Sequence, residues 1–144
     1  MLETNHGHIV TVASMAGHVG TAGLCDYCAS KFAAVGFDDS LRNELVLLGK
    51  DGINTTVVCP YYINTGMFDG VKSKLIPLLE TDYVTDKMLQ AILTNQQVLM
   101  LPRLMYIVAV MSRLFPIRVL SYIANELFET NQAMNSFSGR KKNH

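Results

Sequence analysis

Three short apolar runs, each bounded by residues that form turns, predict buried strands. They are residues 8–13, 53–59 and 97–101, and they are rich in valine, isoleucine and leucine. Their apolar residues do not alternate strictly with polar ones, which is typical of parallel strands covered on both faces. Gly7 precedes the first run, and Pro60 and Pro102 follow the second and third.

Stretches with apolar residues at helical spacing separate these runs. The first predicted helix begins at Cys25 and ends near Gly49 or Gly52, and the second is capped by Thr81 or Asp82 and ends near Asn95. Two further helices are predicted over residues 104–115 and 117–128, broken by Pro116. The order strand, helix, strand predicts a parallel unit with a right-handed crossover, and therefore an α/β fold.

The ends and the middle of the chain carry weaker patterns. Leu2 and Glu3 are expected to end a helix, with Asn5 and Gly7 as its stop signal. Residues 61–79 are rich in turn formers, and residues 138–144 are polar and expected to fray.

Composition narrows the class of protein. The 144 residues are 49% apolar, enough for one domain with a sizeable core. Twelve basic and twelve acidic side chains cancel, which argues against a nucleic-acid partner. The three cysteines form no secreted disulfide framework and favour a reducing compartment. The start does not resemble a signal peptide, and no run of 18 apolar residues predicts a membrane span.

The stretch from Ser14 to Lys31 carries the most specific chemistry. Ser14 stands at the end of the first predicted strand, and Tyr27 and Lys31 lie four residues apart on the helix that follows. That spacing stacks the phenol and the ammonium on one helix face. A cation about 5 Å away favours a phenolate by about 3 kcal/mol at an effective dielectric near ~20. We therefore expect Tyr27 to act as acid and base, Lys31 to activate it, and Ser14 to donate a hydrogen bond to a substrate oxygen.

Each of these residues also has an ordinary structural interpretation. Any helix can carry a tyrosine and a lysine four residues apart as a surface pair, and Ser14 at the strand end is what favours chemistry. Gly17, Gly20 and Gly23 lack the spacing of a dinucleotide loop and are interpreted as a turn lining a substrate pocket. Cys25 and Cys28 are interpreted as packing residues, and no metal site is expected.

These residues resemble the short-chain dehydrogenase/reductase family. The matching parts are residues 7–10 leading to Ser14, residues 27–31, and Pro60 followed by Thr65. The resemblance implies the C-terminal portion of a doubly wound Rossmann-type parallel sheet and NAD or NADP as cofactor. It implies that Ser14, Tyr27 and Lys31 are catalytic, and that the cofactor is bound by Tyr27, Lys31, Pro60, Ile63 and Thr65.

Within that family, the chain is most similar to the membrane-associated retinol dehydrogenase and 17β-hydroxysteroid dehydrogenase branch. This closer match is seen in residues 5–14, 26–31 and 65–68. Residues 102–107 favour the retinol dehydrogenases within that branch. The implied substrate is a small lipophilic alcohol or carbonyl. Retinol and retinal are the first expectation, and a hydroxysteroid is the alternative. The residues expected to contact it are Ser14, Met15, His18, Met67 and Phe68, although the apolar residues after Pro60 also suit plain core packing.

Two features depart from the family pattern. Tyr61 replaces the usual glycine after the proline. The family's glycine-rich phosphate loop also lies upstream of this chain, so residues 1–144 are interpreted as a partial Rossmann-type catalytic domain without its nucleotide-binding N-terminal half. The alternative to an enzyme is therefore an inactive fragment bound to a membrane or to a partner. A homodimer through the helix of Tyr27 is the family's usual pairing.

The last third of the chain carries two patterns that are typical of membrane-associated proteins. Residues 103–137 are expected to form a helical extension, and residues 104–111 are flanked by Arg103, Arg113 and Arg118. Such a segment either lies in a bilayer interface or covers the substrate pocket. Lys141 and Lys142 fit a dilysine retrieval signal. The expected location is the cytosolic face of the endoplasmic reticulum membrane or a lipid droplet, and the alternative is the cytoplasm.

Overall fold

The computed structural model describes residues 1–68, 70–71, 76–116, 118–119 and 122. Most of the helix predicted over residues 117–128, the rest of the predicted extension to residue 137 and the two tail lysines lie outside these residues. The elements run in the order β1 (Gly7–Val12), η1 (Met15–Gly17, a 3₁₀ turn), α1 (Cys25–Leu47), β2 (Ile53–Pro60), α2 (Thr81–Leu93), β3 (Val98–Leu101) and α3 (Leu104–Leu114).

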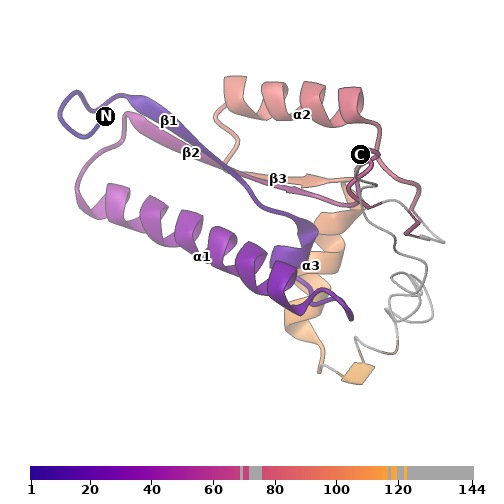
Figure 1. Cartoon of the computed structure of the whole chain (residues 1–144). Helices are drawn as coiled ribbons and strands as arrows, with labels where there is room; N and C mark the ends of the chain where they lie inside the picture. The colour runs from indigo at the N-terminus through magenta and orange to yellow at the C-terminus, as the bar shows by residue number, and fades with distance from the viewer. Residues whose placement is uncertain (69, 72–75, 117, 120–121, 123–144) are drawn as a thin grey trace.

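The three strands form one parallel sheet in the order β1-β2-β3 (Figure 1). In the register of β1 and β2, Gly7 faces Ile53 and Val12 faces Val58. The shorter β3 pairs with the second half of β2, from Val57 to Pro60. The predicted parallel strand–helix–strand unit is confirmed, and all three strands end toward the same edge of the sheet.

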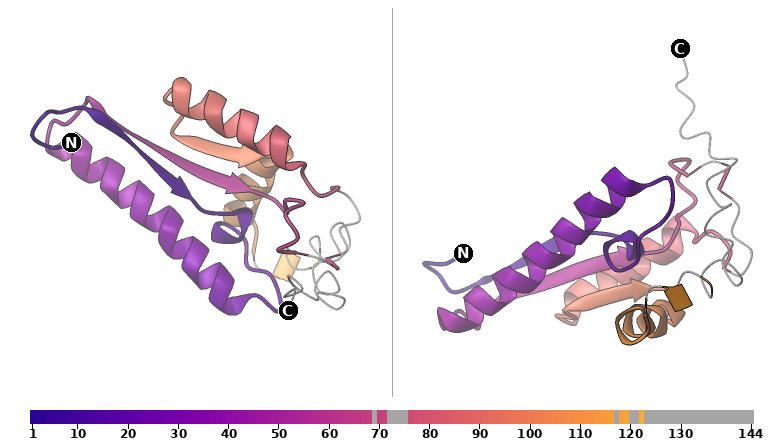
Figure 2. Two further views of the ribbon diagram at one scale, coloured as in Figure 1. Left: turned by 45° about the horizontal axis from the view of Figure 1, so that its top comes forward. Right: turned by 90° about the horizontal axis from the view of Figure 1, so that it is seen from below.

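Helices cover both faces of this sheet. Figure 2 shows α1 and α3 on one side and α2 on the other. The side chains of β2 alternate between the two sides, so Val57 packs in one buried cluster and Val58 in the other. This double burial is the reason why the strand residues form apolar runs with no strict alternation.

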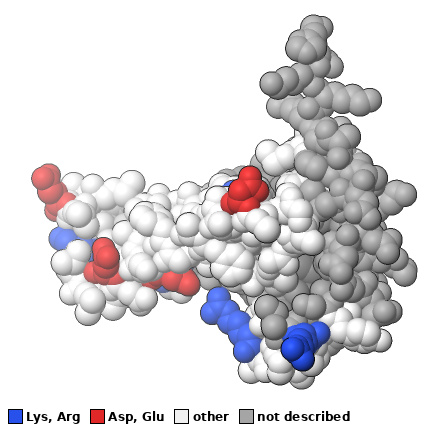
Figure 3. All heavy atoms as spheres, turned by 60° about the horizontal axis from the view of Figure 1, so that its bottom comes forward, with Lys and Arg blue, Asp and Glu red and all other residues white. Residues whose placement is uncertain are grey.

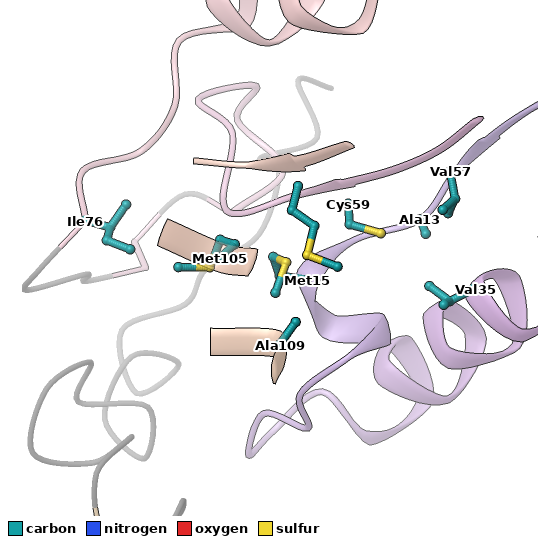
Figure 4. Close-up of a cluster of buried hydrophobic side chains, with 9 residues drawn as sticks. Ala13, Met15, Val35, Val57, Cys59, Ile76, Met105 and Ala109 are labelled. Carbon is teal, nitrogen blue, oxygen red and sulfur yellow. The ribbon is translucent and has the colours of Figure 1, made fainter. Parts of the chain in front are cut away.

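The cluster between the sheet, α1 and α3 is the one that supports the site. Figure 4 shows Met15 from η1 lying beside Met105 and Ala109 from α3, with Cys59 of β2 and Val35 of α1 farther along. Methionine side chains are flexible and fill irregular gaps between elements that cross at different angles. The cluster thereby joins the ends of β1 and β2 to α3, which follows them by more than forty residues.

A buried ion pair fixes α1 against the sheet. Asp38 is fully buried on α1 and forms a salt bridge with Arg42 one turn later. The Arg42 Nε donates to Thr55 Oγ1 of β2 at 3.0 Å, and its Nη1 donates to Asp39 Oδ1 at 3.2 Å. Burial raises the pKa of the Asp38 carboxyl, and the Arg42 guanidinium opposes that rise. The charge of Arg42 therefore compensates a carboxylate that the helix could not otherwise bury.

The structure bears on two predicted element ends. Residues 2–5 are turns, and Asn5 has a φ of 45° while His6 N donates to Met1 O at 3.4 Å, which is the backbone geometry that commonly ends a helix. The Asn5 side chain also binds the residues before β2. Its Nδ2 donates to Asp51 Oδ1 at 2.9 Å, and its Oδ1 accepts from Gly52 N at 3.2 Å. Neither Thr81 nor Asp82 caps α2, since the N-cap residue is Glu80, whose side chain forms no capping hydrogen bond.

Candidate active site

A cavity of about 330 Å³ lies at the carboxyl ends of β1 and β2. Ligands of open parallel sheets bind at this edge, and the volume lies within the ~300–1,000 Å³ range of small-molecule sites. The cavity collects residues from four parts of the chain, namely the loop after β1, α1, the segment after β2, and α3. The predicted site residues that line it are Ser14, Met15, Tyr27, Lys31, Pro60, Ile63, Thr65, Met67 and Phe68.

Ser14 is held at the cavity by the turn that follows β1. It has an extended backbone and is the N-cap residue of η1, where its Oγ accepts a hydrogen bond from Ala16 N at 3.2 Å. The same hydroxyl donates to Pro60 O at 3.4 Å, which is a long bond. A hydroxyl held this way can turn its proton toward a substrate oxygen at little cost.

Tyr27 and Lys31 lie together in the first two turns of α1, as their spacing predicts. The Lys31 Nζ lies 5.6 Å from the centroid of the Tyr27 ring, which is within cation–π range. It also donates to Val12 O at 3.1 Å, so the end of β1 anchors the ammonium beside the phenol. The serine thus lines one cavity with the tyrosine and the lysine, although it follows β1 and they lie on α1.

Three aromatic side chains form the wall opposite α1. Tyr61 and Tyr62 have ring centroids 4.6 Å apart, Tyr62 and Phe68 4.9 Å, and Phe68 and Tyr27 5.8 Å, all with edge-to-face geometry. Burial raises the pKa of the Tyr62 phenol to about 12, with neighbouring Tyr61, Cys28 and Tyr27 adding to the shift. Tyr62 therefore keeps its proton at neutral pH, and it shares the cavity with the phenols of Tyr27 and Tyr61.

The segment after β2 folds back along the cavity. Ile63 forms an isolated parallel bridge with Leu79, and the Thr65 N donates to Ile63 O at 2.9 Å. Gly66 has a φ of 78°, which favours glycine, and it directs Met67 and Phe68 to the cavity wall. The residues implied to contact cofactor and substrate thus share a single turn-rich segment.

His18 is the predicted site residue that the structure does not bring to the cavity wall. Its Nε2 lies 3.5 Å from Cys59 Sγ, on the protein side of the loop. Burial lowers the pKa of the imidazole, Arg113 lowers it further, and Asp39 opposes both. His18 is therefore neutral at pH 7 and packs against the sheet.

The three glycines of the loop have different roles. A Cβ at Gly17 would lie 2.6 Å from Lys31 O, so this glycine allows η1 to approach α1 closely. Gly23 has a φ of 80° just before α1, whereas a Cβ at Gly20 would meet nothing within 4 Å. The loop is a turn beside the cavity, and Thr21 and Leu24 of the same loop contribute to the cavity lining.

The cysteines are free thiols in unlike surroundings. Cys25 is exposed at the start of α1, while Cys28 and Cys59 are buried. Burial raises the pKa of the Cys59 thiol to about 12. Among the described residues, no group of three or more histidine, cysteine, aspartate or glutamate side chains could hold a metal ion.

These surroundings predict selective alkylation. Iodoacetamide reacts with thiolates, so the folded chain at pH 8 is expected to be labelled at Cys25 and protected at Cys59. Peptide mass spectrometry after brief labelling measures the three sites separately, and labelling in urea gives the fully reactive reference. Equal labelling of Cys25 and Cys59 in the folded chain would contradict the burial of β2.

Several cavity residues were not predicted from sequence. Met105 and Val108 of α3 line the cavity although they lie about eighty residues after Tyr27 in the chain, and Tyr62 completes the aromatic wall. The two consecutive tyrosines after Pro60 were the available signal for Tyr62. No local pattern identifies the contribution of α3, because that contribution depends on how α3 packs against the sheet.

The residues at the polar end of the cavity suit the nicotinamide–ribose end of a dinucleotide. An ammonium has three N–H donors, and the hydrogen bond of Lys31 to Val12 O uses one of them, which leaves donors for ribose hydroxyls. The exposed hydroxyl of Thr65 and the adjoining Ile63 lie on the same wall. This donor set fits the group, and Lys31, Ile63, Thr65 and the Tyr27 phenol are the residues that would hold it.

The parallel sheet has helices on both faces, and Ser14, Tyr27 and Lys31 line a cavity at its carboxyl edge. The family model described as short chain dehydrogenase matches residues 1–75. The chain therefore belongs to the short-chain dehydrogenase family.

Curated relatives extend this match along the chain. Human retinol dehydrogenase 10 is 53% identical over 121 residues, which cover 81% of this chain and 36% of that protein. The bovine short-chain dehydrogenase/reductase family 16C member 6 is 45% identical over 145 residues, covering 99% of this chain and 46% of that protein. The chain thus spans less than half the length of these relatives.

Solved structures share the fold. A short-chain dehydrogenase from Burkholderia cenocepacia in complex with NADP has a TM-score of 0.67 and 22% identity, over 88% of this chain and 49% of that one. One from Sphingobium yanoikuyae in complex with NADPH has a TM-score of 0.62 and 22% identity, over 78% and 45% of the two chains. At this level of identity the two structures show a shared fold.

Proposed function

We propose that this chain supplies the proton-transfer and substrate-binding half of an NAD(P)-dependent oxidoreductase that interconverts a lipophilic alcohol and its carbonyl, with retinol and retinal as the substrate pair. One observation carries the proposal, namely that Ser14, Tyr27 and Lys31 meet at one cavity whose other walls are apolar and aromatic. The polar end suits a reacting oxygen, and the remaining wall suits a hydrocarbon. The name of retinol dehydrogenase 10, at 53% identity, favours retinol within this class.

The chain's own residues handle the proton. In the oxidation direction, Ser14 donates a hydrogen bond to the substrate oxygen, and the Tyr27 oxygen accepts the hydroxyl proton. Lys31 places its positive charge beside Tyr27, with its Nζ 5.6 Å from the ring centroid. A bound nicotinamide dinucleotide supplies the hydride acceptor. Reduction of the carbonyl reverses these roles, with the Tyr27 phenol as the donor.

A fused enzyme tests this function. The upstream part of human retinol dehydrogenase 10, joined in frame before this chain, restores the length of the relatives. We expect this fused enzyme to oxidise all-trans-retinol with NAD or NADP, measured as retinal by chromatography, and to turn over a 17β-hydroxysteroid less efficiently. Cofactor binding without retinol turnover would contradict the retinol assignment, and preference for the steroid would favour a hydroxysteroid dehydrogenase.

The open edge of β1 favours a second candidate, a non-catalytic chain that acts by binding. Within the described residues β1 is an edge strand, and Val12 at its end is 55% exposed. Unpaired edges of this kind bind further strands. Titration of the 144-residue chain alone with NADP and NAD separates the two candidates, since cofactor binding with turnover by this chain would contradict the non-catalytic one.

We further propose that the protein acts at the cytosolic face of the endoplasmic reticulum membrane or at a lipid droplet. The proposal is supported by the free thiols, which suit a reducing compartment, and by the low water solubility of the proposed substrate. Within the described residues, no helix has both the length and the apolarity needed to cross a bilayer.

A further inference from the structure

Helix α3 presents an apolar face to solvent, which we call the outer face of α3. It consists of Leu104, Ile107, Val110, Met111 and Leu114, and each of these side chains is exposed. Ile107 is 61% exposed and Leu114 is 70% exposed. Large aliphatic side chains at helical spacing with this exposure form a contiguous patch, which soluble proteins keep for interactions.

The opposite face of α3 belongs to the active-site cavity. Met105 is buried and Val108 is half-buried, and both line the cavity, while Ala109 packs in the cluster of Figure 4. The helix is therefore a single layer between the cavity and the outer face. A surface bound to that face would lie one helix diameter, about 10 Å, from the cavity wall.

The described charged residues within and next to α3 in the sequence are all basic. Arg103 precedes the helix, Arg113 lies in its last turn and Arg118 follows it, and all three are exposed. The sequence has no acidic residue between Asp86 and Glu126. Figure 3 shows basic side chains, in blue, near the lower edge of the molecule. This combination is complementary to an anionic surface that also accepts apolar side chains.

Helix α1 gives a useful contrast, because it also exposes large apolar side chains. Leu47 is 86% exposed and Val46 is 74% exposed near its end. The helix exposes three acidic residues, Asp26, Asp39 and Glu44, whereas its fourth carboxylate is buried in the ion pair with Arg42. Exposure of apolar side chains alone therefore does not distinguish the two helices, whereas the sign of their exposed charges does.

We propose that the outer face of α3 docks on an anionic phospholipid bilayer, with its aliphatic side chains below the headgroups and its arginines at headgroup level. The docking depends on this surface alone. A second consequence rests on the proposed function, namely that a lipophilic substrate would enter the cavity from the bilayer past α3.

Vesicle co-sedimentation of the 144-residue chain tests the docking. We expect binding to phosphatidylcholine vesicles that contain phosphatidylserine, and at least tenfold weaker binding to vesicles of phosphatidylcholine alone. High salt is expected to weaken the first interaction, since surface charges are screened within a Debye length. No substrate or cofactor is present, so the result is independent of the proposed oxidoreductase activity.

Matched variants locate the contact. The double substitution Ile107→Asp and Leu114→Asp is expected to abolish binding, while Leu47→Asp on α1 is expected to bind as the unchanged chain does. Replacing Arg113 by Gln is expected to weaken partition about fivefold, because a cation near an anionic surface contributes about 1 kcal/mol. Circular dichroism of each variant checks that these exposed substitutions leave the fold intact.

Three outcomes would overturn the proposal. The unchanged chain could fail to bind either vesicle, or the double variant could bind as well as the unchanged chain. In the third outcome, gel filtration would show a dimer that the double variant loses while vesicle binding is absent, which would assign the outer face of α3 to a second copy of the chain.

Discussion

Replacing Tyr27 by phenylalanine is expected to reduce retinol turnover by the fused enzyme about 10²–10⁴-fold, the usual contribution of a positioned acid or base. The substitution removes one oxygen and keeps the ring, so the edge-to-face contact with Phe68 at 5.8 Å is retained. Retinal formation at saturating retinol and cofactor measures the loss. The urea midpoint is expected to change little, because the ring and its packing are kept.

Tyr62 provides the matched control, because it is a second phenol on the same cavity. Burial raises its pKa to about 12, so it keeps its proton where Tyr27 must exchange one. Tyr62→Phe is therefore expected to lower turnover far less than Tyr27→Phe. If the two variants lose turnover equally, or if Tyr27→Phe stays active, the assignment of acid and base is wrong.

The second large effect is on stability, and it is expected from Gly17→Ala. The added Cβ would lie 2.6 Å from Lys31 O and 2.8 Å from a Val35 methyl, closer than side-chain carbons approach other atoms. Backbone on one side and a buried side chain on the other leave little room to relax. We expect a loss of about 1–3 kcal/mol in the free energy of unfolding, measured by urea denaturation.

Gly36→Ala is the control for this substitution. A Cβ at Gly36 meets nothing within 4 Å, and the residue lies inside α1. Alanine is a better helix former than glycine, so the variant is expected to gain about 0.5–1 kcal/mol. A neutral Gly17→Ala would mean that η1 is not packed against α1 as the structure places it.

The sequence predicts the elements of this fold well because its signals are local. Short runs rich in apolar residues and bounded by turn formers identified the three strands, and the spacing of Tyr27 and Lys31 placed them on one helix face, where the structure has them. Parallel strands have their carboxyl ends at the same edge of the sheet. The polar end of the cavity could therefore be predicted from Ser14 at the end of β1 and Pro60 at the end of β2.

The rest of the site depends on contacts that no local pattern contains. Met105 reaches the cavity because α3 returns beneath the sheet, and Gly17 is required because η1 and α1 approach closely. His18 was expected at the pocket from its place in the loop, yet its side chain turns toward Cys59. The sequence shows that a residue such as His18 lies in a loop, but the direction of its side chain depends on tertiary packing.

The division of the core by β2 has a practical consequence for protein engineering. Val57 and Val58 are neighbours in the chain but belong to separate clusters, and the buried residues of α2 belong to the cluster of Val58. Tyr61 packs against both clusters, and Tyr61 and Ile63 also line the cavity. Changes to the layer around Val84 can therefore reach the cavity through these two residues, and a redesign of that layer for thermal tolerance must keep Tyr61 and Ile63 in place to preserve the shape of the cavity.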